Sequence, residues 1–203
     1  MKTVKIGLKS ISPYSQSRIV AVEALPSESK DDYERRNWRH RIHADSEGGV
    51  YIPPMCFKKT LDSAAKYSAL QIPGKGKATY TKCVESGVLI FDPLPLNVDR
   101  DQVEGEWLFL DANGKKGKQS SGRVQRCMPK IDHWEGELTV RVIDETVLNM
   151  HPVRKSITVL QFFFEQAGAL IGVGRFRPEN GGFYGRFLVT SFRVVEESDE
   201  AAA

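Results

Sequence analysis

The sequence predicts an α+β fold with a β-α-β-β-α-β core, the ferredoxin-like arrangement, carrying long inserted basic loops. Three observations support it: a period-two alternation near the start of the chain, two segments with helical periodicity, and strand-like runs around those segments. Without the insertions, the order is strand, helix, strand, strand, helix, strand. Both helices should then pack on one face of an antiparallel sheet, leaving the other face and the loops open to ligands.

The first strand and the first helix have the clearest patterns. Residues 2–9 alternate polar and apolar side chains, as in a half-buried strand. The helix should begin at Pro53 or Pro54, because proline has no N–H to leave unpaired in a first turn. It should end before Pro73. Its buried side should consist of Phe57, Leu61, Ala64, Ala65 and Ser68.

The second helix is predicted from His151-Pro152 onward, because apolar residues then recur at steps of four and three up to Ala167. Gly168 is well placed as its carboxyl-terminal stop. The remaining strands should span residues 88–91, 106–110, 137–143 and 184–195.

We expect one domain over residues 1–195, with insertions at about 10–50 and 92–136. Residues 10–49 mix turn formers with charge, which fits an insertion or a mobile arm better than core. The acidic end, 196–203, should be a disordered tail.

The bulk composition is that of an ordinary globular protein, with 40% hydrophobic residues, 27% charged residues and a net charge of +3. No run approaches the length of a membrane span, and the first residues lack the apolar centre of a signal peptide. The three cysteines are scattered, which argues against a disulfide framework or a zinc site. We therefore expect a cytoplasmic protein with no membrane partner, no cofactor and no metal.

The most informative charge lies in residues 112–131, which contain no acidic residue. Glycines and serines should keep this segment mobile, and its cations should repel one another until a polyanion neutralises them. Such binding weakens steeply with salt. The alternative is a solvated surface loop. The cations are Lys115, Lys116, Lys118, Arg123, Arg126 and Lys130.

A second basic cluster surrounds Trp38. Guanidinium groups can clamp phosphates in a bidentate manner, and an aromatic ring among them can stack on an unpaired base. The equally weighted alternative is that Trp38 belongs to the core and that the arginines pair with nearby acids. The arginines are Arg35, Arg36, Arg39 and Arg41.

A third cluster is the glycine-rich segment 172–186, in which glycines alternate with aromatic residues and with Arg175, Arg177 and Arg186. Glycines allow a backbone to approach a ligand closely and can expose N–H groups to an anion. The alternative is a tight glycine hairpin whose aromatic rings return to the core.

Nothing in the sequence completes a catalytic motif. His40 and His43 lie near Asp45 and Glu47, but no matching set of ligands or partners stands at a recognised spacing. Cys56 has the apolar surroundings of a core residue. We predict a protein that is not an enzyme, with a metal-independent ribonuclease using His40 or His43 as an alternative.

Residues 50–67 and 171–189 resemble two segments of the RAMP superfamily, the RRM-like RNA-binding proteins of CRISPR effector complexes. Residues 50–67 are similar to that family's Ile-Pro turn and following helix, although Met55 and Cys56 stand where Gly-Ser is usual. Residues 171–189 resemble its glycine-rich loop. The resemblance implies that four cations face a nucleic-acid backbone: Lys58, Lys59, Arg175 and Arg177.

The resemblance also implies self-association along a nucleic-acid strand, with 112–131 acting as a thumb over a neighbour's RNA. Our leading hypothesis is non-catalytic binding of single-stranded nucleic acid, RNA in preference to DNA, by phosphate contacts and stacking. The chain would serve in an oligomeric or CRISPR-type complex, or as a stand-alone phage or mobile-element relative. The alternative is a protein–protein interaction module, such as a phage inhibitor that mimics a CRISPR subunit.

Overall fold

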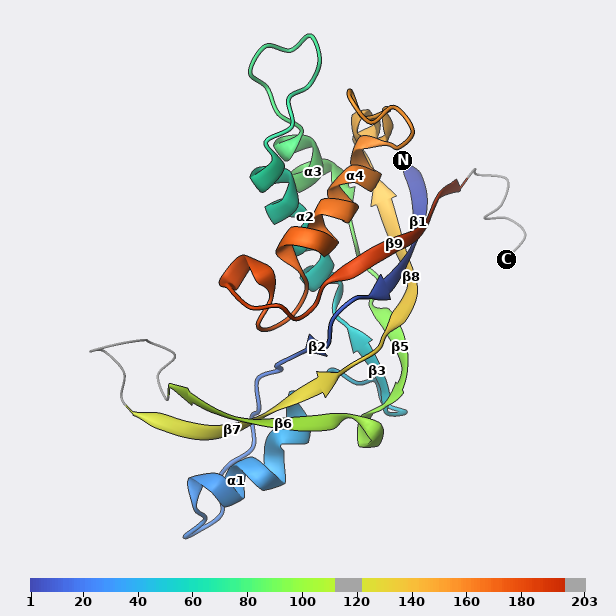
Figure 1. Cartoon of the computed structure of the whole chain (residues 1–203). Helices are drawn as coiled ribbons and strands as arrows, with labels where there is room; N and C mark the ends of the chain where they lie inside the picture. The colour runs from blue at the N-terminus through green and yellow to red at the C-terminus, as the bar shows by residue number, and fades with distance from the viewer. Residues whose placement is uncertain (112–121, 196–203) are drawn as a thin grey trace.

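The computed structural model describes residues 1–111 and 122–195. Its upper half is a four-stranded antiparallel sheet with the order β4-β8-β1-β9 (Figure 1). Numbered within this sheet alone, the strands lie in the order second, third, first, fourth, which is ferredoxin-like and confirms the predicted core. The strands are β1 Lys2–Ser10, β4 Val88–Leu89, β8 Glu135–Val142 and β9 Phe187–Val195.

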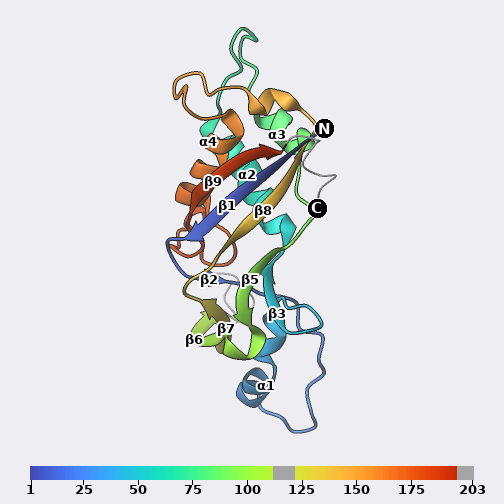
Figure 2. The same cartoon turned by 90° about the vertical axis from the view of Figure 1, so that its right-hand side faces the viewer.

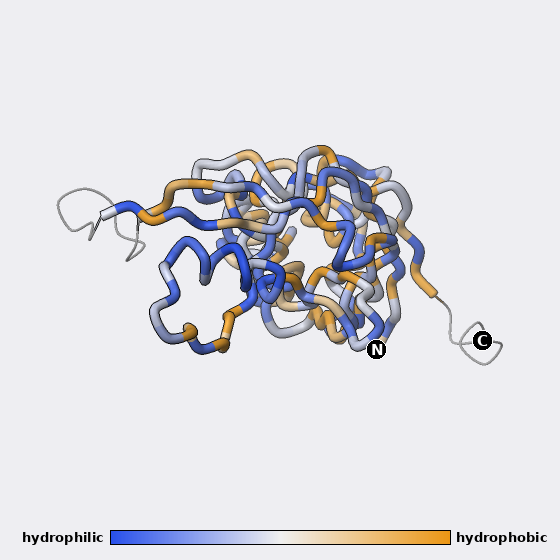
Figure 3. Tube along the Cα trace, turned by 90° about the horizontal axis from the view of Figure 1, so that it is seen from below, coloured by the Kyte–Doolittle hydropathy of each residue, from blue (hydrophilic) through white to orange (hydrophobic). Residues whose placement is uncertain are grey.

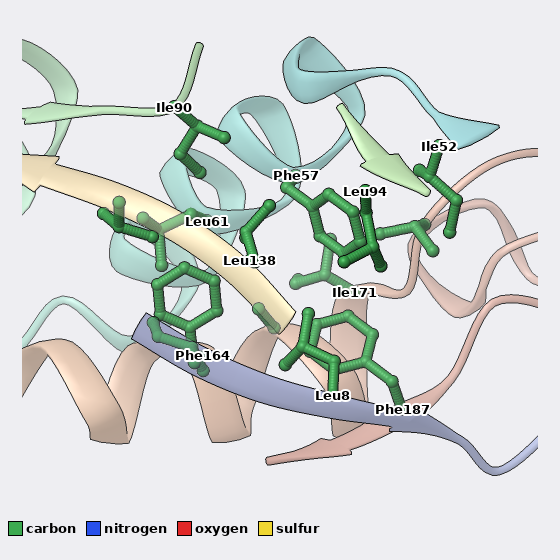
Figure 4. Packing of buried hydrophobic residues seen from close by; sticks show 14 of the residues in the cluster. Leu8, Ile52, Phe57, Leu61, Ile90, Leu94, Leu138, Phe164, Ile171 and Phe187 are labelled. Carbon is green, nitrogen blue, oxygen red and sulfur yellow. The ribbon is translucent and has the colours of Figure 1, made fainter. Parts of the chain in front are cut away.

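The helices cover one face of this sheet and leave the other open, as Figure 2 shows. Among the described residues, no helix is both long enough and apolar enough to cross a membrane. The inward face of β1 is fully buried beneath the helices, as the alternation predicts. The side chains of Leu8, Phe57 and Phe187 lie together in this layer (Figure 4), where the rings of Phe57 and Phe187 meet edge to face at 6.0 Å. The helices are α2 Pro54–Ser68, α3 Thr81–Gly87 and α4 Val159–Gln166.

The second core helix differs from its prediction at both ends. It begins at Val159, where the Thr158 hydroxyl accepts the N–H of Gln161 at 3.1 Å. Beyond α4 the chain continues as a π-helical turn, Ala167–Ile171. Gly168 is therefore not the stop: a Cβ there would overlap the carbonyl oxygen of Phe187, so this glycine allows β9 to pack against the helix.

The two predicted insertions pair with each other and form the lower half of the molecule in Figure 1. The first insertion is not a mobile arm, because it contains a helix, two strands and the buried rings of Tyr14 and Trp38. The second contains the hairpin β6–β7, so Arg123–Ile131 is a strand and not a loop. The sheets are β2-β7-β6 and β3-β5. Their elements are α1 Lys30–Asn37, β2 Tyr14–Ser15, β3 Gly49–Ile52, β5 Leu94–Asp99, β6 Glu104–Asp111 and β7 Arg123–Ile131.

Short 3-10 turns complete the described chain. They span Trp38–Arg41, Arg100–Gln102, Glu145–Leu148 and Pro178–Asn180.

A fully buried carboxylate holds the lower half together. Glu34 on α1 accepts two hydrogen bonds from the Arg41 guanidinium, at 2.6 and 2.9 Å, and one from Arg126 Nη1 at 3.0 Å. It also accepts the backbone N–H of Cys127 on β7 at 2.7 Å. A buried charge is stable only when it is compensated in this way. The cluster therefore fixes α1 against β7.

We predict that Glu34→Gln lowers the free energy of unfolding by about 3–5 kcal/mol, because Arg41 would keep its charge in a buried site without a counter-ion. Urea unfolding followed by circular dichroism measures this. The matched control is Glu135→Gln, which removes an exposed ion pair with Lys9 and should cost less than about 1 kcal/mol. Equal costs for the two variants would contradict a buried structural carboxylate.

His151 predicts a pH dependence of stability. Its ring is 5% exposed, and Nδ1 accepts the N–H groups of Val153 and Arg154 at 3.2 and 2.9 Å. Burial, with help from the charge of Arg154 and against that of Glu165, lowers the pKa of His151 below its usual value near 6.5. Below pH 6.5 the unfolded chain therefore binds the extra proton more readily, and stability falls as the pH falls.

We expect His151→Asn, which keeps an acceptor for the two N–H groups, to flatten the dependence of the urea midpoint on pH between about 5 and 7. His133→Asn, at an exposed histidine, is the control and should leave the slope unchanged. A slope that His151→Asn does not alter would assign the pH dependence to other groups.

Candidate nucleic-acid interface

A basic pocket of about 270 Å³ lies where the start of α2 meets the glycine-rich loop 172–186. Its cations are Lys59 from α2 and Arg175 and Arg177 from the loop. The remaining lining includes no carboxylate and consists of Tyr14, Gln16, Ser17, His43, Met55, Cys56 and Gly174. We call this site the basic pocket.

Main-chain hydrogen bonds hold the glycine-rich loop against the segment around β2. The N–H of Arg175 donates to the carbonyl of Ser15 at 2.8 Å, and that of Gly185 donates to Pro13 at 2.7 Å. Gly174 has a φ of +78°, and a Cβ there would run into the Ser15 carbonyl and the Tyr14 ring. Glycine is therefore required where the two segments meet.

The hydroxyl of Thr60 ties this loop to α2 by donating to the carbonyl of Gly172 at 2.9 Å. Lys59, the preceding residue on the helix, thereby stands at a fixed position beside the loop arginines.

Several buried donors at the basic pocket lack a partner among the described residues. They include Nε2 of Gln16, a residue only 2% exposed, and the Nε atoms of Arg175 and Arg177. Arg177 also pairs with Glu179 at 2.5 Å through Nη2. Unpaired buried donors destabilise a fold unless a ligand or water completes them. All three residues line the basic pocket, which favours an acceptor-rich, anionic ligand there.

The titratable groups of the basic pocket agree with this polarity. Burial, and secondly the charge of Arg41, lowers the pKa of Arg175. Burial raises the pKa of the Cys56 thiol, although Arg177 and Lys59 oppose the rise. Burial and the charge of Arg18 lower the pKa of His43. At neutral pH the Cys56 thiol and the His43 imidazole are therefore uncharged. The electrostatic potential in the basic pocket is determined by Lys59, Arg175 and Arg177.

The structure brings together three of the predicted cations and separates two others from them. The Lys58 ammonium donates to Asp62 and to the carbonyl of Val84, so Lys58 is tied to its own helix and α3. The Arg186 guanidinium donates to the carbonyl of Ala169. Both cations bind partners within the fold, and neither lines the basic pocket.

In the 35–41 cluster the core and ion-pair alternative is the observed arrangement. Trp38 is buried, with Arg39 stacked at 4.3 Å from its ring centroid, and Arg41 is buried on Glu34. The predicted base stacking by Trp38 and phosphate binding by Arg41 are therefore wrong, because both side chains are buried within the fold. Arg36 binds Glu28 with two hydrogen bonds of 2.7 Å, and Arg35 pairs with Asp32 at 3.6 Å.

The cluster at 112–131 is described only in part. Lys115, Lys116 and Lys118 lie outside the described residues. Arg123 is exposed at the start of β7, whereas Arg126 binds Glu34. Figure 3 shows the β6–β7 hairpin extending from the body, with hydrophilic and hydrophobic residues following one another along it.

The open sheet face does not provide an RRM-type platform. Lys5 pairs with Glu137 at 3.3 Å, Arg193 pairs with the same carboxylate at 3.0 Å, and Gly7 lies opposite Ser191. No aromatic side chain occupies this face in the described strands, so it lacks the rings on which such sheets stack bases. The pocket residues that sequence reasoning missed are Tyr14, Gln16 and Ser17, which lie in the predicted arm and share no motif.

Comparison with known proteins identifies the fold. No protein-family model matches the chain, and no curated protein matches it in sequence. A chain of the Type III-B Cmr-beta complex, solved by cryo-EM bound to cognate target RNA, is similar with a TM-score of 0.51 and 14% identity. The match covers 96% of this chain and 61% of that one, so the present chain spans less than two thirds of its length.

Cmr6 from Pyrococcus furiosus is a second similar structure, with a TM-score of 0.46 and 14% identity over 93% of this chain and 98% of that one. The chain therefore shares its fold with the Cmr-beta chain, and the fold that the resemblance implied is confirmed.

We predict that Arg175→Met lowers nucleic-acid affinity without lowering stability. Methionine keeps the apolar volume beside the Phe176 ring, over which the guanidinium lies at 5.1 Å, and removes a half-buried charge. The free energy of unfolding should stay within about 1 kcal/mol of wild type or rise. Urea unfolding measures this, and a loss of several kcal/mol would show that Arg175 is a structural residue.

Proposed function

We propose that the chain binds single-stranded RNA without cleaving it, by placing a backbone phosphate in the basic pocket. One observation carries this proposal: Lys59, Arg175 and Arg177 line one pocket, no carboxylate is among the other residues that line it, and only Arg177 of the three has an acidic partner, Glu179. Arginine and lysine are the usual partners of phosphate oxygens, through charge-assisted hydrogen bonds. A phosphate would complete donors that the fold leaves unpaired.

The structural similarity supports RNA over DNA and a role inside an assembly. The Cmr-beta structure contains cognate target RNA, and its matching chain shares this fold over 96% of the present chain. We infer that this chain occupies a comparable position in a CRISPR-type complex. Self-association along the strand is part of the same proposal.

The test is a salt series with a labelled single-stranded RNA, followed by fluorescence anisotropy. Wild-type affinity should fall steeply with salt, because each phosphate contact releases condensed counterions. We expect Lys59→Ala with Arg177→Ala to weaken binding at every salt concentration. The slope of log K against log salt should become shallower by about 0.7 for each phosphate interaction that the substitutions remove.

The matched control is Lys77→Ala with Lys82→Ala, which removes two exposed lysines beyond the far end of α2. This double variant carries the same change in net charge and should bind nearly as wild type does. No binding at low salt, a salt-independent affinity, or equal losses in the two double variants would overturn the proposal.

His43 supports a second candidate, a metal-independent ribonuclease. Its imidazole lines the basic pocket, and its lowered pKa keeps it uncharged at neutral pH, as a general base requires. Denaturing gels of the same binding reactions separate the two functions. Intact RNA after long incubation supports pure binding, whereas cleavage that His43→Ala abolishes supports the enzyme.

A further inference from the structure

We propose that Phe183 is a stacking platform for an unpaired base of the strand whose phosphate occupies the basic pocket. The inference rests on the proposed function, and it adds contact with a nucleobase to the binding of a phosphate. It makes binding selective for single strands, because the bases of a duplex are already stacked and paired.

Phe183 is exposed and held in place. Its side chain is 64% exposed, and the ring of Tyr184 meets it edge to face at 4.7 Å. The hydroxyl of Ser12 donates to the Phe183 carbonyl at 2.7 Å and accepts the N–H of Arg186 at 3.0 Å. The backbone around Phe183 is therefore fixed on both sides, so a base that stacks there need not order the loop.

A continuous set of contacts joins Phe183 to the basic pocket. Tyr184 packs edge to face on Phe176 at 5.9 Å, and its N–H donates to the Phe176 carbonyl at 3.0 Å. The Arg175 guanidinium lies over the ring of Phe176 and lines the basic pocket. The exposed ring and Arg175 thus belong to one small unit of the loop.

The loop is built to hold this shape. Phe176 has a φ of +52°, which is unusual for a residue with a side chain, and a Cβ on Gly182 would overlap the Phe176 carbonyl. The hydroxyl of Tyr184 donates to both carboxylate oxygens of Glu106 on β6, at 3.1 and 3.0 Å. Close packing within the loop and the hydrogen bonds to β6 therefore hold the residues behind Phe183 in place.

Exposure alone does not identify a binding residue, because single exposed aromatic rings are common on protein surfaces. Phe91 is 65% exposed and belongs to none of the contacts of the basic pocket. Phe183 differs from Phe91 in its rigid support and in the ring contacts that link it through Tyr184 and Phe176 to Arg175. Proteins that bind single strands combine these two elements, a cationic track and aromatic rings.

Anisotropy with a labelled single-stranded RNA tests the proposal. Phe183→Ala should weaken binding about 5- to 150-fold, the range expected for one base stacked on one ring, and leave the salt slope unchanged. Phe183→Trp should restore binding. The matched control Phe91→Ala, which removes an equally exposed ring, should bind as wild type does. Thermal unfolding confirms that each variant is folded.

Inorganic polyphosphate has charge but no nucleobases, so it distinguishes phosphate binding in the basic pocket from base stacking on Phe183. Phe183→Ala should bind it as wild type does, whereas Lys59→Ala with Arg177→Ala should not. Wild-type RNA affinity in Phe183→Ala would overturn the stacking role and leave phosphate binding standing. Equal losses for RNA and polyphosphate would show that Phe183 only supports the loop. Absence of RNA binding by the wild type would overturn both proposals.

Discussion

The short segment 13–15 is hydrogen-bonded on two sides, and the arrangement of the two halves depends on it. On one side Tyr14 and Ser15 pair with Ile131 and Lys130 of β7, in the layer formed by the insertions. On the other side the carbonyls of Pro13 and Ser15 accept N–H groups from the glycine-rich loop, which leads into β9 of the core sheet. The basic pocket lies where the residues around β2, the glycine-rich loop and the start of α2 meet.

The backbones of the glycine-rich loop and of segment 13–15 approach so closely that a residue with a side chain would not fit between them. Gly174 contacts the Ser15 carbonyl and the Tyr14 ring, and a Cβ on Gly185 would overlap the Val173 carbonyl. The glycine-rich loop is therefore a tight turn, as the alternative predicted, although Phe183 does not return to the core. The loop is also a wall of the basic pocket. The two interpretations are compatible, because a rigid loop presents its arginines and Phe183 at fixed positions.

The local patterns in the sequence predicted the core well. Alternation in 2–9 and the small residues of 54–68 depend on near neighbours, and the structure confirms both elements. The insertions could not be predicted, because β2 pairs with β7 and β3 with β5 across more than forty residues. The same separation hid the contacts of Glu34 with Arg126 and Cys127 on β7, which lie 92 and 93 residues away. Its pairing with Arg41, only seven residues away, is the ion-pair alternative that the sequence analysis left open.

Which cations remain for a ligand is decided by the acids that the fold brings near them. Arg36, Arg41 and Lys58 each receive a carboxylate, and so does Arg177, which also lines the basic pocket. Arg175 receives a second arginine as its neighbour, and its Nε is left unpaired. A buried cation without a counter-ion costs stability, and a fold retains it most readily where a ligand supplies the anion. The local lack of a counter-charge at Arg175 therefore points to the interface more strongly than the number of basic residues does.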